Sequence, residues 1–385
     1  MTTPSSLPVI LHRCDQFVGR TTNWLYDHLR FIPRYTPHVI CDSLANRQEF
    51  PELDAEVWSS NSEALSRRAW RKIFGHRIFP PDASRLRKLS PRVLHSHFGY
   101  VAVEDLALAE FLEVPWFVGF YGADVYQLGL LGEWRRQYAP MFARAALVLA
   151  LGPVMAEELG KLGCPRGKIR VHALGVDVHS LPVRPRVVPS GTPLRLLFAG
   201  TFREKKGIRY VIESAALARK SGVHLELNLV GDAAGKPGDL EVKRAISDQI
   251  RNLHLEDVVI SHPYLSFNDL VALALECHVF LAPSVTATDG DREGTPFVLQ
   301  QLMATGMPAL STLHSDIPFL FGELRFLLVP ERDAQALAAR LIGYASNPDS
   351  LTAHGLALRQ QMQNHFDVRK CAARLADLYE EFIPR

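Results

Sequence analysis

Short apolar runs alternate with longer amphipathic segments along the chain, and this rhythm limits the fold more than any other feature of the sequence. The runs predict strands at residues 7–13, 38–41, 92–97, 116–120, 146–151 and 168–174, and again at 194–200, 225–231, 258–261, 278–283 and 308–312. Strands that alternate with helices are typical of βαβ units and a parallel sheet. The sequence therefore predicts an α/β protein with two doubly wound, Rossmann-like sheets.

A proline-rich segment separates the two series of strands. Residues 181–193, LPVRPRVVPSGTP, contain four prolines and little periodicity, which marks an interdomain linker. A chain of 385 residues also exceeds the usual size of a single core. We predict domains at residues 1–185 and 186–367 that face one another across a central cleft, where open α/β sheets bind ligands.

The composition favours a folded protein of a reducing compartment. The 43 basic and 41 acidic residues nearly cancel, so we expect no nucleic acid partner. The five cysteines form no CxxC pair and have no histidine spacing suited to zinc. No signal segment and no window of about 18 apolar residues is found, so we expect a cytoplasmic protein.

One segment departs from this even balance of charge. Residues 67–92 carry nine Lys or Arg against a single Asp82, with Trp70, Ile73 and Phe74 interleaved. A solvated helix face is one interpretation of the pattern. The other is a surface that meets anionic lipid headgroups or a phosphate-bearing acceptor, which would attach the protein peripherally to the inner face of a membrane.

The stretch DGDREGTP, residues 289–296, stands directly before an apolar helical segment. Pro296 suits the first turn of a helix, because the N–H that it lacks would be unpaired there. The first N–H groups of a helix have no partner inside it and carry partial positive charge, which suits phosphate. We therefore expect an anionic ligand at the amides of Gly294, Thr295 and Phe297.

Polar residues also follow several predicted strands, at the edge where parallel sheets bind ligands. The loop AGTFREKKG, residues 199–207, carries Arg203, Lys205 and Lys206 toward the next helix. These cations would suit a clamp on a diphosphate, although such loops are also common on protein surfaces. LVGDA ends a strand with Gly231 and Asp232. In the N-terminal half, HSHFGY and GFYGADVY place three polar residues beyond two strands, namely His97, Tyr121 and Asp124.

Several motifs together resemble one enzyme family. REKKGIRYVIES, LVGDA, KIRVHALGVD and the stretch from LHLEDVVISHPYL to GMPALST resemble the retaining glycosyltransferases of the GT-B fold, which include sucrose synthase and phosphatidylinositol mannosyltransferases. DGDREG and HSHFG look most like the branch that builds bacterial exopolysaccharides such as colanic acid. The resemblance covers nearly the whole chain, most strongly 146–320. It also implies that the C-terminal helix, within residues 368–385, packs back on the N-terminal domain.

The resemblance implies a retaining hexosyltransferase whose donor substrate is a nucleotide-diphosphate sugar and which needs no cofactor. Lys206 would hold the diphosphate, Glu293 would bind hydroxyls of the donor sugar, and Tyr121 would stand near the reacting bond. His97 and Asp124 would line the acceptor side. The donor-binding residues that it implies are Gly19, Gly200, Thr201, Arg203, Lys206, Gly231, Asp232, Tyr264, Glu293, Gly294, Thr295, Pro296, Phe297 and Gln301.

The sequence departs from the family pattern at three of these positions. Thr201 stands where an arginine is usual, and Arg203 lies two residues further on. Tyr121 replaces the histidine of a FHGxD pattern, and Gln301 replaces the second glutamate of a paired-glutamate motif. A glutamine can still bind ribose hydroxyls as donor and acceptor. These departures motivate an alternative, a catalytically silent relative that binds a nucleotide sugar.

The carboxylates of Asp289 and Asp291 raise the question of a divalent metal. Members of the GT-B fold typically neutralise the leaving diphosphate with basic side chains and helix amides. The resemblance therefore implies a metal-independent enzyme in which these two aspartates shape the loop. Lys206, Arg203 and the helix end would stabilise the departing diphosphate electrostatically.

The donor base, the sugar and the acceptor stay open. A saccharide, a lipid-linked oligosaccharide and a small natural product are all compatible acceptors. A sugar-nucleotide epimerase or a phosphorylase on the same fold is a further alternative. An oxidoreductase that uses a dinucleotide is disfavoured, because no G-x-G-x-x-G follows the first strand of either half.

Overall fold

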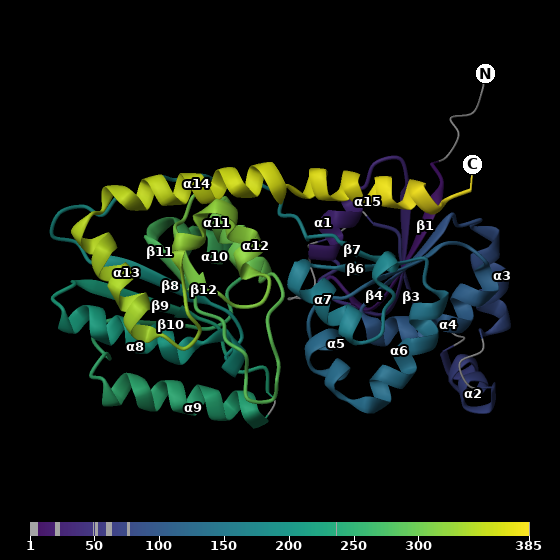
Figure 1. Cartoon of the computed structure of the whole chain (residues 1–385), viewed down its shortest axis with the longest axis horizontal. Helices are drawn as coiled ribbons and strands as arrows, with labels where there is room; N and C mark the ends of the chain where they lie inside the picture. The colour runs from purple at the N-terminus through teal and green to yellow at the C-terminus, as the bar shows by residue number, and fades with distance from the viewer. Residues whose placement is uncertain are drawn as a thin grey trace, which may run out of the picture. The chain divides into compact units, whose positions relative to one another are not determined.

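The computed structural model describes residues 7–19, 24–48, 50, 53–58, 64–74, 78–235 and 237–384. The chain divides into two compact units, one made of residues 1–175 with 368–385 and the other of residues 176–367. Each unit contains its own parallel sheet with helices packed around it (Figure 1). The prediction of an α/β protein with two Rossmann-like sheets is confirmed.

The first unit is a doubly wound sheet in the order β3-β2-β1-β4-β5-β6-β7. Its strands are β1 (Val9–Phe17), β2 (Thr36–Leu44), β3 (Ala55–Val57), β4 (Val93–His97), β5 (Trp116–Gly119), β6 (Leu147–Ala150) and β7 (Ile169–Val171). Its helices are α1 (Trp24–Arg30), α2 (Ala64–Phe74), α3 (Pro80–Lys88), α4 (Gly99–Leu112), α5 (Ala123–Tyr126), α6 (Gly132–Arg144), α7 (Pro153–Lys161) and α15 (Val368–Phe382). The strand order reverses between β1 and β4, and ligands of such sheets bind beyond the strand ends at that point.

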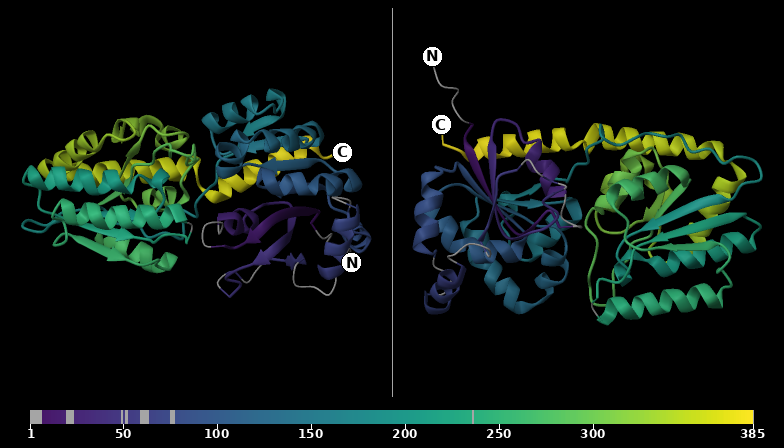
Figure 2. Two further views of the ribbon diagram at one scale, coloured as in Figure 1. Left: turned by 90° about the horizontal axis from the view of Figure 1, so that it is seen from below. Right: turned by 180° about the vertical axis from the view of Figure 1, so that it is seen from behind.

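The second unit repeats this plan in the order β10-β9-β8-β11-β12-β13. Its strands are β8 (Leu194–Ala199), β9 (Leu225–Val230), β10 (Val259–His262), β11 (Val279–Ala282), β12 (Ala309–Thr312) and β13 (Leu328–Val329). Its helices are α8 (Ile208–Lys220), α9 (Pro237–Asn252), α10 (Phe267–Glu276), α11 (Phe297–Ala304), α12 (Ile317–Phe321), α13 (Ala334–Ser346) and α14 (Asp349–His365). Helix α8 packs against α9, whereas α11 and α12 pack against α14 (Figure 2).

Each strand predicted from the sequence overlaps a strand of the structure. The central strands β5, β6, β11 and β12 are buried along their whole length, as continuous apolar runs in a sheet covered on both faces should be. The sequence missed β3 and β13, which are too short to show a period.

The proline-rich segment 181–193 is part of the second unit, and the chain divides earlier, between Gly175 and Val176. Its role as a linker was therefore wrongly predicted. Arg186 is 2% exposed, and its Nη2 donates to Thr305 Oγ1 at 3.1 Å. The hydroxyl of Thr352 donates to the carbonyl of Arg186 at 2.8 Å. Buried polar contacts of this kind hold the segment against the unit.

The C-terminal helix α15 belongs to the first unit. Its buried face enters a core cluster with Ile10 and Phe117, to which it contributes Leu375 and Tyr379. A Cβ on Gly175 would lie 2.5 Å from the Cα of Val368, so the start of the helix sits directly on the chain there. The chain therefore crosses between the two units twice and returns to the first core to complete it.

Candidate active site

Two loops of the second unit bring predicted donor residues together. Gly207 is the N-cap of α8 with a φ of 67°, and a Cβ there would lie 1.9 Å from the carbonyl oxygen of Pro283. Only glycine fits that backbone. The turn before it carries Lys205 and Lys206, whose ammonium groups lie 3.2 Å and 3.1 Å from the carboxylate of Glu293. The contact between Lys206 and Glu293 joins two residues that are far apart in the sequence.

Glu293 is a buried carboxylate, 8% exposed, between two cations. Burial alone would raise its pKa, but the attraction of Lys205 and Lys206 outweighs burial and lowers the pKa of Glu293 to about 2. Burial lowers the pKa of Lys205, yet Glu293 and Asp291 outweigh that effect and raise it. The cluster therefore holds a permanent anion beside cationic side chains at neutral pH.

Asp291 ties the two loops together. Its carboxylate is 3.1 Å from Lys205 Nζ and 3.7 Å from Arg203 Nη1, and it is 2% exposed. The backbone N–H of Asp291 donates to Asp289 Oδ1 at 2.9 Å. Both aspartates therefore shape the loop, as predicted. Because cations already surround Asp291, the geometry gives no support to a metal ion there.

A buried histidine fixes the backbone of Glu293, and the sequence analysis missed it. The N–H of Glu293 donates to His314 Nε2 at 3.1 Å. Since that nitrogen accepts, Nδ1 carries the proton and donates to Glu331 Oε1 at 2.7 Å. Glu331 also accepts from the N–H of Thr286 at 2.8 Å. No local sequence signal marks His314, because its partners come from other loops.

The end of α11 has the unpaired donors that the sequence predicts. The helix begins at Phe297, one residue later than predicted, and Pro296 is its N-cap with φ −56° and ψ 119°. Among the described residues, the backbone N–H groups of Gly294, Thr295 and Phe297 donate no hydrogen bond. The Oγ1 of Thr295 is also buried without a partner there. Buried polar groups of this kind usually have partners, which a water molecule or a ligand can supply.

The ends of β8 and β9 place two more predicted glycines side by side. A Cβ on Gly231, which has a φ of 136°, would lie 2.0 Å from the carbonyl oxygen of Gly200. The carbonyl of Asp232 accepts from the hydroxyl of Tyr264 at 2.7 Å, and its carboxylate pairs with Lys243 at 2.6 Å. Asp232 and Tyr264 are thus in contact, and their assignment to the donor site stays a prediction.

Two predicted residues are not joined to the ionic cluster. Gln301 is 9% exposed on α11, and Thr201 lies in the loop after β8. Within the described residues, neither side chain donates or accepts a hydrogen bond with Lys205, Lys206 or Glu293. Their assignment to donor binding stays a prediction.

In the first unit, His97 and Tyr121 are in contact, with His97 Nδ1 2.7 Å from the phenolic oxygen. Asp124 is fully buried and turned toward the backbone, where it accepts from the N–H groups of Gly99 and Gly122 at 3.0 Å and 2.8 Å. Asp124 also accepts from the N–H of Tyr121 at 3.1 Å. The carboxylate therefore fixes the loop that carries Tyr121. The placement of these residues on the acceptor side stays a prediction.

Gly19 follows β1 and is buried, but residues 20–23 of the predicted donor and acceptor loop lie outside the described residues. The assignment of Gly19 to the donor site stays a prediction.

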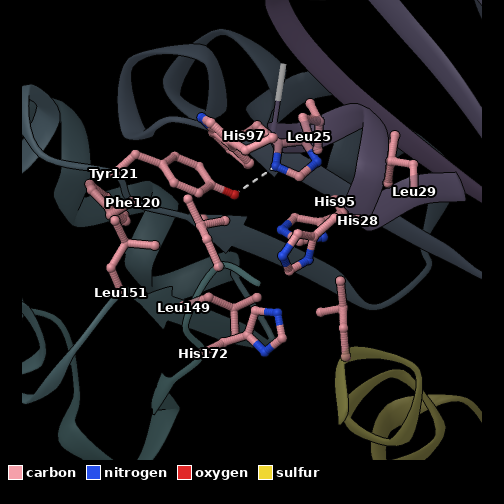
Figure 3. Close-up of a pocket in the computed structure, with 14 residues that line it drawn as sticks. Leu25, His28, Leu29, His95, His97, Phe120, Tyr121, Leu149, Leu151 and His172 are labelled. Atoms are coloured by element: carbon pink, nitrogen blue, oxygen red, sulfur yellow. Dashed lines mark hydrogen bonds between the residues drawn. The ribbon is translucent and has the colours of Figure 1, made fainter. Parts of the chain in front are cut away.

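A cluster of buried histidines lies beside Tyr121. The sequence analysis pointed to only one of them, His97. The cluster comprises His12, His28, His95, His97 and His172, all within 8% exposure. Several of them line a cavity with Tyr121 that offers about 20 Å³ to the centre of a water molecule (Figure 3), enough for a single water. One sequence signal could have revealed this cluster: His95 and His97 stand two residues apart on one strand, and such residues point to the same face of a sheet.

Three of these side chains come close enough to hold a metal ion. The ring nitrogens of His12, His95 and His97 lie within 4.8 Å of one another. His97 uses both of its nitrogens for other contacts, with Nε2 3.1 Å from His12 Nδ1 and Nδ1 beside Tyr121. We therefore interpret the group as a hydrogen-bond network of neutral imidazoles. Burial lowers the pKa of His12 to about 3 and that of His97 well below its usual value.

The basic segment forms two helices, α2 and α3, whose cations are partly engaged. The buried carboxylate of Asp82 accepts from Arg67 at 2.6 Å and from Arg85 at 2.8 Å. On α2, the side chains of Leu65, Ile73 and Phe74 are 75%, 71% and 43% exposed. Residues 75–77 of the segment lie outside the described residues. Asp82 thus engages Arg67 and Arg85, whereas the apolar side chains of the basic helix α2 stay exposed.

Comparison with known proteins gives the family. A family model described as glycosyl transferases group 1 matches residues 183–363, and one described as a glycosyl transferase 4-like domain matches residues 18–175. The chain is 33% identical over 292 residues to the protein named colanic acid biosynthesis glycosyltransferase WcaL of Escherichia coli, which covers 75% of this chain and 70% of that relative. The chain belongs to the group 1 glycosyltransferases.

Other members and solved structures agree with this assignment. The amylovoran biosynthesis glycosyltransferase AmsK of Erwinia amylovora is 32% identical over 289 residues, covering 74% of this chain and 69% of AmsK. HepE of Anabaena, solved with UDP and glucose, matches with a TM-score of 0.76 at 16% identity, over 97% of this chain and all of HepE. The protein is thus a glycosyltransferase with the GT-B fold.

No helix in the described part of the chain combines the length and apolar character that crossing a bilayer requires.

Proposed function

We propose that this glycosyltransferase takes a nucleotide-diphosphate sugar as its donor and transfers the sugar with retention of anomeric configuration. The observation that carries the proposal is the cluster of Lys205, Lys206 and Glu293 in the same unit as the unpaired amides of Gly294 and Thr295. Cations and helix amides suit a diphosphate, and a buried carboxylate suits sugar hydroxyls. HepE, a structural neighbour, was solved with UDP and glucose.

In this proposal, Glu293 has two states. Without a donor it neutralises Lys205 and Lys206, at 3.2 Å and 3.1 Å. With a donor, Lys206 turns to the diphosphate, and the freed carboxylate oxygen accepts from hydroxyls of the sugar. Lys205 stays with Asp291 and Glu293 and keeps the carboxylate in place. The ion pair between Lys206 and Glu293 is thus replaced by two charge-assisted contacts, one from Lys206 to the diphosphate and one from a sugar hydroxyl to Glu293.

The chemical step follows from these contacts. The bond between the anomeric carbon and the diphosphate oxygen breaks, and Lys206 with the α11 amides stabilises the negative charge on the leaving group. The acceptor oxygen forms the new bond on the same face, and the leaving phosphate oxygen takes its proton. Glu293 serves hydroxyl binding, because two lysines already engage it as a permanent anion.

The acceptor class is proposed as a saccharide, either lipid-linked or free, used in the cytoplasm. The exposed Leu65, Ile73 and Phe74 on basic α2 support contact with an anionic membrane surface, where a lipid-linked acceptor would be found. The names of WcaL and AmsK assign these relatives to colanic acid biosynthesis and amylovoran biosynthesis, which supports a role in bacterial polysaccharide synthesis.

The test is a donor screen. The protein is incubated with UDP-, GDP- and ADP-sugars, and release of the nucleoside diphosphate is followed, since slow donor hydrolysis reveals an active enzyme without its acceptor. NMR of the sugar anomers then reports retention or inversion. A catalytically silent relative would bind a donor in a thermal-shift screen and release no diphosphate, and an epimerase would return a changed nucleotide sugar; either outcome would refute the proposal.

A further inference from the structure

The loop between β11 and α11 is held by side chains that come from two other loops. Strands β11, β12 and β13 are parallel neighbours in the second sheet, so their carboxyl ends lie at one edge. Thr286 follows β11, His314 follows β12 and Glu331 follows β13. These three residues therefore meet at the edge where open α/β sheets bind ligands.

A single carboxylate serves both ends of this loop. At the start of the loop, Glu331 Oε2 accepts from the N–H of Thr286 at 2.8 Å. Glu331 Oε1 accepts from Nδ1 of His314 at 2.7 Å. At the end of the loop, Nε2 of the same ring accepts from the N–H of Glu293 at 3.1 Å. Glu331 is thus bonded directly to one end of the loop and through His314 to the other.

The charge states of the pair suit these contacts. Both oxygens of Glu331 act as acceptors, which only the ionised carboxylate allows. Burial alone would raise the pKa of Glu331, but the hydrogen bonds from Thr286 and His314 outweigh burial and lower it. Burial also lowers the pKa of His314, by more than Glu331 raises it. The neutral ring has one N–H, which Glu331 places on Nδ1, and this leaves a bare Nε2 for Glu293.

The contact with His314 fixes the backbone from which the unpaired amides of the site continue. The N–H of Glu293 is engaged by His314. The next N–H groups, those of Gly294, Thr295 and Phe297, donate no hydrogen bond within the part of the chain that the structure describes. Because the peptide at Glu293 is held, the direction of these amides and the origin of the Glu293 side chain are set before any ligand arrives.

We propose that Glu331 is a positioning residue for the nucleotide-sugar donor, and that it acts through His314 on Glu293 and the amides beyond it. Glu331 itself touches no donor atom. By holding the loop in its binding geometry in the free enzyme, Glu331 and His314 remove the entropic cost of ordering it when the donor binds. The inference rests on the proposed function, because that function assigns Glu293 and the amides to the donor.

The hydrogen-bond arrangement is tested without a substrate, by NMR of the full-length protein at neutral pH. The 15N shifts of the His314 ring, assigned with His314→Gln, should show a proton on Nδ1 and a bare Nε2. Glu331→Gln offers one amide oxygen to two donors, so exchange of the Glu293 N–H with solvent should quicken about tenfold or more. Glu323→Gln, at an exposed position, is the matched control. A proton on Nε2, or equal exchange in the two glutamine variants, would overturn the arrangement.

The role in donor binding is tested by kinetics with UDP-, GDP- and ADP-sugars. Glu331→Gln is expected to raise donor KM about tenfold and to change kcat less than about threefold, because the loop is held in the ground state and the transition state alike. A merely structural role would lower the folded fraction, and so kcat, without moving KM. KM of Glu331→Gln equal to that of Glu323→Gln would refute the positioning role.

Two variants of His314 separate its two contacts. His314→Gln carries an amide oxygen near the place of Nε2 and can still accept from the Glu293 N–H, whereas the amide of His314→Asn reaches only the place of Nδ1. His314→Gln should therefore have the lower donor KM and the slower exchange at Glu293, and equal values would refute the action through that N–H. If no nucleotide sugar is turned over, the proposed function and the donor role of Glu331 both fail, while amide exchange still judges the hydrogen-bond arrangement.

Discussion

Lys206 Nζ and Glu293 Oε2 are 3.1 Å apart, and this ion pair joins the loop after β8 to the loop before α11. The residue proposed to hold the diphosphate is therefore neutralised by the residue proposed to bind the sugar until a donor separates them. Each charge offsets part of the cost of taking the other out of water in this largely buried site.

Lys206→Ala is expected to reduce donor turnover about 100-fold or more, because the leaving diphosphate loses its cation. The measurement is kcat for release of nucleoside diphosphate. Lys220→Ala, an exposed lysine at the end of α8, is the control and should behave like the wild type. Turnover of Lys206→Ala equal to that of Lys220→Ala would remove the diphosphate clamp from the mechanism.

Glu293 should make stability depend on acid pH. Its folded pKa, about 2, lies below its ordinary value of 4.5, so its contribution to the free energy of unfolding is fully present above about pH 4.5 and is lost as pH falls toward 2. Urea unfolding at several pH values should show a smaller loss of stability in this window for Glu293→Gln than for the wild type. Parallel pH profiles of the two proteins would contradict the burial and pairing of the carboxylate.

His314→Ala should destabilise the second unit by about 2 kcal/mol, because the buried N–H of Glu293 loses its acceptor and Glu331 Oε1 loses its donor. Donor KM should rise as well, since the loop that carries Glu293 loses its anchor. His224→Ala, an exposed position, is the matched control. A His314→Ala protein with wild-type stability and KM would show that the hydrogen bond is dispensable.

Gly207→Ala should unfold or strongly destabilise the second unit, because the added Cβ would meet the carbonyl of Pro283 at 1.9 Å in a backbone with φ of 67°. Gly160→Ala on α7 meets nothing within 4 Å and should be neutral or slightly stabilising. Thermal unfolding compares the two. A soluble Gly207→Ala protein with unchanged Tm would mean that the turn before α8 relaxes freely.

Ile73→Asp should weaken binding to anionic vesicles, because it places a carboxylate in the exposed apolar surface of α2. Co-sedimentation with vesicles rich in phosphatidylglycerol measures the effect, with pure phosphatidylcholine vesicles as a reference. Leu356→Asp, an exposed apolar residue on α14, is the control. Equal binding by Ile73→Asp, Leu356→Asp and the wild type would leave the surface without a membrane role.

Several residues that the structure brings together in the candidate site of the second unit could be picked out from the sequence, because local patterns mark them. Gly207 and Gly294 stand at strand-to-helix turns, and Lys206 stands beside one of them, so short motifs reveal them. His314 and His12 carry no such mark. Each acquires its role from a partner in a different strand or loop, and contacts between distant segments leave no period in the sequence.

The sequence by itself determined the secondary structure, the parallel sheets and the family, because these depend on apolar periodicity and on motifs of a few neighbouring residues. The sequence indicated that segment 181–193 is an interdomain linker, but the segment belongs to the second unit, and only the packing of Arg186 reveals this. Tertiary structure alone decided that Glu293 is shared by two lysines and that His12, His97 and Tyr121 form one chain. Charges and hydrogen bonds act over a few ångströms in space, and only the folded chain sets those distances.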